Sequence, residues 1–160
     1  MNKRMSRRVA GFTIAEVLVC LAIFALILTA VATAFSAAGN NYNQNRDMSD
    51  AMNMARLALT RMTTEMRSAK AIADDDPAGQ CSVITSDSED IVFRYNSGDK
   101  KLYLDKDGSS YTLCEKVESL TFTPHTDIHG NVKSVEMSIT VKPGSTSQTM
   151  SAAVVLRKMV

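Results

Sequence analysis

Glu16 is the residue in this chain that most needs a chemical partner, because it is the one charged residue between Gly11 and Arg46. A carboxylate among apolar helices must be paired or protonated. If the chain were cut after Gly11, the new amine of Phe12 would lie at the same apolar boundary, just over one helical turn from Glu16. In a bundle of such helices, a neighbour's Phe12 amine can pair with Glu16, neutralise both charges and set the axial register between the helices.

Two other groupings carry weaker signals for chemistry. Asp105-x-Asp107-Gly108 resembles the start of a calcium loop, but its twelfth position is Lys116 instead of glutamate. The loop His125–His129 could supply two or three zinc ligands, although nothing nearby suggests a general base. Phosphate-binding loops and nucleophile elbows do not occur in the sequence. We therefore predict a hairpin turn and a solvated loop at these places, and no catalytic residue, metal or cofactor.

The charge is uneven along the chain. Its net value is +1, from 18 Lys and Arg against 17 Asp and Glu. Four of the cations precede the apolar run: Lys3, Arg4, Arg7 and Arg8. Without these four, 14 cations remain against 17 acidic residues, a net charge of −3 that gives no reason to expect a nucleic-acid partner.

The run from Val17 to Ala38 contains no charged residue and is long enough to cross a lipid bilayer. About 20 helical residues span a hydrocarbon core of about 30 Å, and Gly and Pro are absent from Phe12 through Ala38. Basic residues before such a run hold that end in the cytoplasm. We therefore expect residues 1–11 to be a leader and residues 12–38 to be a single membrane-spanning helix, with the rest of the chain outside the cytoplasm.

An ordinary secretory signal peptide is the main alternative. Ala30-Val31-Ala32 and Ala32-Thr33-Ala34 both match its small-x-small cleavage site, which would release a soluble, secreted binding module. Against this, the apolar region is longer than the usual signal core, and Glu16 adds an insertion cost with no role in secretion. A permanently anchored single-pass protein that keeps residues 1–11 is a third alternative.

Residues 39–76 are predicted to continue the helix with one apolar face. The residues of that face alternate at spacings of four and three: Met48, Met52, Ala55, Leu59, Met62, Met66 and Ala69. Pro77, after three aspartates, ends the pattern. The sequence thus predicts one helix of about 60 residues and about 90 Å, with a bend or local melting near Gly39.

Residues 77–160 change to the period of two that is typical of strands. The predicted strands are Cys81–Thr85, Ile91–Tyr95, Lys101–Asp105, Ser110–Thr123, Val132–Val141 and Thr149–Arg157. An antiparallel meander with one buried face would cover the apolar face of the helix. The predicted fold class is therefore α+β, a long N-terminal helix packed on a β head.

Two cysteines, Cys81 and Cys114, lie in this β-rich part. In an exported, oxidising setting they could join as a disulfide. Two free, buried thiols are the alternative. We expect the disulfide, provided that the head is exported.

The segment Gly11-Phe12-Thr13-Ile14-Ala15-Glu16-Val17-Leu18-Val19 resembles the class III signal of type IV pilins and related pseudopilins. It has glycine, then phenylalanine, then glutamate at the fifth mature position, and it leads directly into a membrane helix. Ala15 departs from the larger aliphatic residue usual before the glutamate. The resemblance implies that a prepilin peptidase cuts between Gly11 and Phe12 and methylates the new amine.

The resemblance also implies partners and a life cycle. The helix would leave the inner membrane, at an assembly platform, to pack against other pilin or pseudopilin subunits in a filament core, with the pilin-like β head outward. Type IV pili, type II secretion systems and DNA-uptake systems share this signal, so all three stay open.

A minor subunit is favoured within that family. The helix lacks the kinking Pro common in major pilins. Arg61–Ala69, Ile91–Tyr95 and Val117–Phe122 are similar to segments of the J-type (PilW-like) minor pilins and pseudopilins, which are thought to join a tip complex that primes assembly.

Overall fold

The computed structural model describes residues 11–157. Its contacts divide the chain into two compact units, Met1–Tyr42 and Asn43–Val160, which are described in turn. The predicted leader cations Lys3, Arg4, Arg7 and Arg8 lie outside the described residues.

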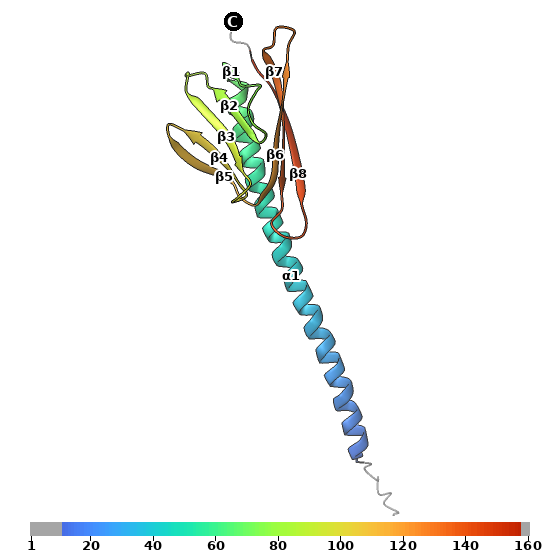
Figure 1. Cartoon of the computed structure of the whole chain (residues 1–160). Coiled ribbons are helices and arrows are strands. Elements are labelled where there is room, and N and C mark those ends of the chain that lie inside the picture. The colour runs from blue at the N-terminus through green and yellow to red at the C-terminus, as the bar shows by residue number, and fades with distance from the viewer. Residues whose placement is uncertain (1–10, 158–160) are drawn as a thin grey trace, which may run out of the picture. The chain divides into compact units, whose positions relative to one another are not determined.

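One long helix, α1, runs from Ile14 to Arg67 (Figure 1). It is continuous through Gly39, so the local melting expected there is absent. It is also shorter than predicted, because residues 71–72 form a strand instead of a last helical turn. The backbone N–H groups of Lys70 and Ala73 donate to the carbonyl groups of Ile84 and Ser82, so pairing with a neighbouring strand replaces the helical pattern here.

Eight strands form two antiparallel sheets in the second unit (Figure 1). The first sheet has the order β1-β2-β3-β4-β5, and the second has the order β6-β7-β8. Their bounds are β1 Ala71–Ile72, β2 Gln80–Ile84, β3 Asp90–Asn96, β4 Lys101–Lys106, β5 Ser109–Cys114, β6 Val117–Thr126, β7 Val132–Val141 and β8 Gln148–Val155. The α+β class is confirmed, although the head is two meanders instead of one.

The division between the sheets falls inside the single strand region that the sequence predicted for residues 110–123. Lys116, with a φ of 59°, lies in the left-handed region and turns the chain between β5 and β6. Pro124 does not end β6 as expected; it lies opposite Val135 of β7. Proline is tolerated there because β6 is an edge strand with one unpaired side.

The hydrophobic core contains the apolar face of α1 and the inner faces of the strands. The buried residues of α1 are Ala51, Ala55, Ala58, Leu59, Met62 and Met66. Phe93, Leu102 and Ile139 of the strands are fully buried in the same cluster. The predicted methionine stripe is therefore packing surface, as its helical spacing indicated.

The expected Cys81–Cys114 disulfide is wrong, since both thiols are free and buried. Cys81 lies in β2 and Cys114 in β5, and β3 and β4 run between them. Three strand spacings of about 4.8 Å separate the two cysteines by about 14 Å, whereas a disulfide needs Cα atoms within about 7 Å. Burial raises the pKa of the Cys81 thiol to about 12 and that of Cys114 to about 11.

Candidate functional site at the start of the apolar helix

Thr13 and Glu16 close the first turn of α1 with reciprocal hydrogen bonds. The backbone N–H of Thr13 donates to Glu16 Oε2 at 2.8 Å, and Thr13 Oγ1 donates to the same oxygen at 2.9 Å. The backbone N–H of Glu16 donates to Thr13 Oγ1 at 3.3 Å. This is a capping box, in which a threonine and a glutamate three residues later satisfy backbone donors that a helix start leaves free.

The cap fixes the place of the Glu16 carboxylate at the amino end of α1. A negative charge is favourable there because the free N–H groups of a helix start are electropositive. The second carboxylate oxygen, Oε1, makes no hydrogen bond within residues 11–157. It is therefore available to accept a donor from another molecule.

Gly11 precedes this cap without any steric reason to be glycine. A Cβ added to it would meet no atom within 4 Å. Folding of the described residues therefore does not demand glycine at this position.

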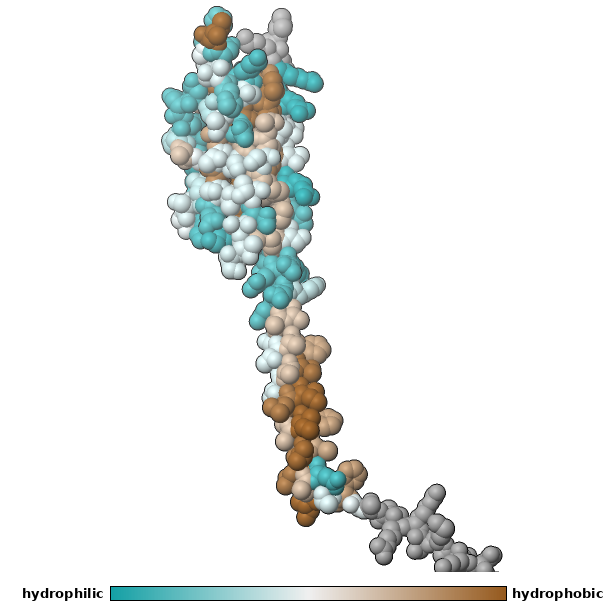
Figure 2. Space-filling view, turned by 90° about the vertical axis from the view of Figure 1, so that its right-hand side faces the viewer, coloured by the Kyte–Doolittle hydropathy of each residue, from teal (hydrophilic) through white to brown (hydrophobic). Residues whose placement is uncertain are grey.

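Apolar side chains cover much of the face of the first part of α1 that Figure 2 shows. The most exposed large ones are Phe12, Ile14, Leu18, Leu21, Phe24, Leu26, Leu28 and Phe35. The hydroxyl groups of Thr29 and Thr33 donate to the carbonyl groups of Leu26 and Ala30, so they present no free donor to a lipid phase. Among the described residues, α1 is the one helix apolar and long enough to cross a membrane.

Residues 6–32 match the family model of the prokaryotic N-terminal methylation motif. This match begins before the capped turn and ends inside the apolar part of α1. This motif, together with the long apolar helix that follows it, supports membership of the type IV pilin and pseudopilin family. Proteins of this family are structural, and the apolar helix of this pilin-like protein fits anchoring in the inner membrane. A comparison with curated proteins finds no match.

The sequence predicts functional roles for Gly11, Phe12 and Glu16; in the structure Gly11 and Phe12 precede α1, and Glu16 lies in its first turn. The sequence reasoning missed Thr13 as the intramolecular partner of Glu16. A signal was present, because threonine followed three residues later by glutamate before an apolar run is the capping-box pattern.

Proposed function

We propose that this pilin-like protein is a minor subunit of a type IV filament and helps to initiate or cap its assembly. Before assembly it crosses the inner membrane once, with residues 12–38 in the bilayer and the head of residues 77–160 outside the cytoplasm. Residues 1–11 form the leader, and residues 39–76 join the membrane segment to the head.

Maturation is proposed to occur at Gly11 and Phe12. A prepilin peptidase removes the leader after Gly11 and methylates the amine of Phe12. The methylation motif at residues 6–32 supports this step, and so does the open space around Gly11, which leaves its glycine without a folding role.

Assembly is proposed to use Glu16. Its carboxylate keeps one oxygen free of hydrogen bonds within the described chain, at an otherwise apolar surface. The Phe12 amine of a neighbouring pilin or pseudopilin subunit can therefore bind there and neutralise both charges. The capped Glu16 at the head of an apolar helix is the observation that carries this proposal.

N-terminal analysis of the mature protein by mass spectrometry tests the proposal. We expect the first residue to be methylated Phe12. A first residue near Phe35 would instead mean release by ordinary signal peptidase as a secreted binding module, and an intact leader would mean a permanent anchor without a filament role.

A further inference from the structure

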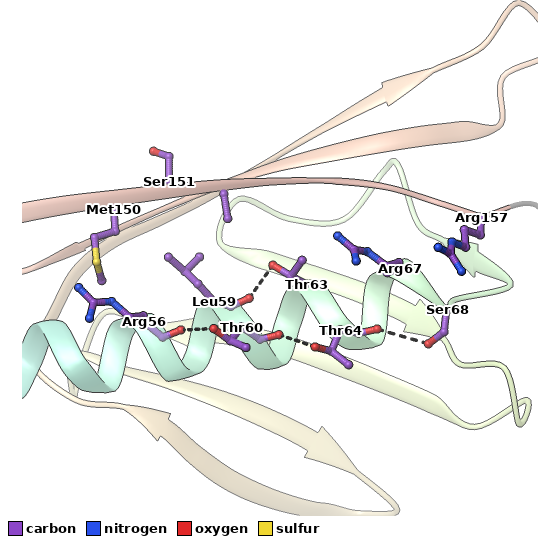
Figure 3. Close-up of a pocket in the computed structure, with 11 residues that line it drawn as sticks. Arg56, Leu59, Thr60, Thr63, Thr64, Arg67, Ser68, Met150, Ser151 and Arg157 are labelled. Atoms are coloured by element: carbon purple, nitrogen blue, oxygen red, sulfur yellow. Dashed lines mark hydrogen bonds between the residues drawn. The ribbon is translucent and has the colours of Figure 1, made fainter.

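A groove with a volume of about 1110 Å³ lies between α1 and β8 within the unit Asn43–Val160. Residues from Arg56 to Ser68 line its helix side, and residues from Met150 to Arg157 line its strand side (Figure 3). Pockets for drug-sized ligands have volumes of about 300–1,000 Å³. The groove is therefore large enough for a segment of polymer.

The helix side of the groove has no free hydroxyl donor among its threonines. Thr60, Thr63 and Thr64 donate their hydroxyl protons to carbonyl groups one turn earlier, at 2.9, 2.7 and 2.8 Å (Figure 3). They therefore present methyl groups, and Leu59 and Ala152 add further apolar surface. The side-chain donors that remain for an occupant are guanidinium groups.

Three arginines supply those guanidinium groups: Arg56, Arg67 and Arg157. Their side chains have no ion pair or hydrogen bond within residues 11–157, whereas Arg61 on the same helix pairs with Glu65 at 2.8 Å. The backbone N–H of Arg157 donates to the carbonyl group of Arg67 at 3.4 Å, so two cations are held at one end of the groove. Arg56 lies at the other end (Figure 3).

The strand side of the groove is the edge of a sheet. The order β6-β7-β8 leaves one side of β8, residues Gln148–Val155, without a partner strand in the described chain. The backbone N–H and C=O groups of such an edge are a template for an added strand. Arg56 and Arg67 are 11 residues apart, about 16 Å along the helix, which is about five residues of extended chain. A strand with carboxylates at alternate positions would therefore place a carboxylate near the arginine at each end of the groove.

We propose that this groove binds an extended acidic segment of a neighbouring filament subunit, which adds to the free edge of β8 and places its carboxylates against Arg56, Arg67 and Arg157. Nucleic acid suits the groove less well, because no aromatic side chain lines it for base stacking. The inference rests on the proposed function only in taking the partner to be a filament subunit.

The test uses the full chain in detergent micelles and a fluorescent seven-residue peptide of alternating glutamate and valine. Matched peptides carry lysine in place of glutamate, or N-methyl groups on alternate backbone amides, which block strand addition. Fluorescence anisotropy measures Kd, and hydrogen exchange measures protection of the β8 amides. Peptide binding is measured in micelles, without any filament. A failure of the groove proposal can therefore be told apart from a failure of the proposed role in filament assembly.

The glutamate peptide should bind at least ten-fold more tightly than the lysine and N-methylated peptides, and it should slow exchange in β8. The double substitution Arg56→Glu and Arg67→Glu should weaken binding at least ten-fold, while Arg61→Gln, whose guanidinium is already paired, should leave Kd unchanged. The proposal is overturned by no binding to the unsubstituted chain, by equal binding of the three peptides, or by an equal loss in Arg61→Gln. The proposal would also be overturned if duplex DNA displaced the peptide and the peptide gave the β8 amides no protection from exchange.

Discussion

Thr13 Oγ1 donates a hydrogen bond to Glu16 Oε2 at 2.9 Å and accepts one from the Glu16 backbone N–H at 3.3 Å. The carboxylate that suits pairing between subunits is thus also the cap of its own helix. A single chain can hold this charge in place before any neighbour arrives, with one oxygen left over for that neighbour.

Thr13→Val removes both hydroxyl hydrogen bonds and keeps the size of the side chain. Loss of a helix cap costs about 1 kcal/mol, so amides in the first turn of α1 should exchange about five-fold faster in detergent micelles. Thr13→Ser keeps the hydroxyl group and is the matched control. Equal exchange rates in the two variants would mean that the cap contributes nothing.

Gly11→Leu should leave an uncleaved, membrane-bound precursor. The described structure has room for a side chain at this position, so a processing defect would reflect the peptidase and not misfolding. Intact mass and circular dichroism check the two points separately. Gly39→Ala, also in open space, should be processed normally. Normal cleavage of Gly11→Leu would refute the peptidase assignment.

Glu16→Val should be cleaved but lost from assembled filaments, because the neighbouring amine loses its partner. Co-purification with filament subunits measures the effect. Glu65→Gln is the control, since that carboxylate pairs with Arg61 on the exposed side of the head half of α1. Normal co-purification of Glu16→Val would show that the proposed pairing is wrong.

Met62→Ala should lower the free energy of unfolding of the head by about 2–5 kcal/mol, the usual cost of such a truncation in a core. Met62 is fully buried, whereas Met54 on the same helix is 44% exposed and Met54→Ala should cost under about 0.5 kcal/mol. Urea denaturation of both variants in micelles measures the difference. Similar losses would place Met62 outside the stabilising core.

Cys81 and Cys114 should resist an alkylating reagent at pH 8 in the folded protein, because burial raises their pKa values to about 12 and about 11 and keeps the reactive thiolate scarce. Cys20 is exposed in the single chain, so its thiol should react before those of Cys81 and Cys114. Unfolding in denaturant without a reductant should make all three thiols reactive. Mass spectrometry counts the added groups, and a pair that stays unreactive until reduction would indicate a disulfide after all.

Much of this architecture follows from periodicity. Spacings of four and three placed Met62 and Met66 on the buried side of α1, and strict alternation gave β7 its observed bounds, Val132–Val141. Long, regular patterns are reliable because many residues share one burial requirement.

The errors arose where distant residues decide the structure. The end of α1 depends on pairing of Ile72 with Val83, and the fate of Cys81 and Cys114 depends on the order of strands in a sheet. The groove arginines escaped notice for the same reason, since Arg157 is 90 positions from Arg67 in the sequence and its place beside α1 comes from β8. Local spacing carries no information on such pairings.

The separation of Cys81 and Cys114 by two strands affects where the protein can fold in a cell. The head reaches its final packing without any covalent crosslink, so its folding requires neither an oxidant nor a disulfide isomerase. The same fold should form in a reducing cytoplasm and in an oxidising compartment. Transfer from one to the other would leave the redox state of Cys81 and Cys114 unchanged.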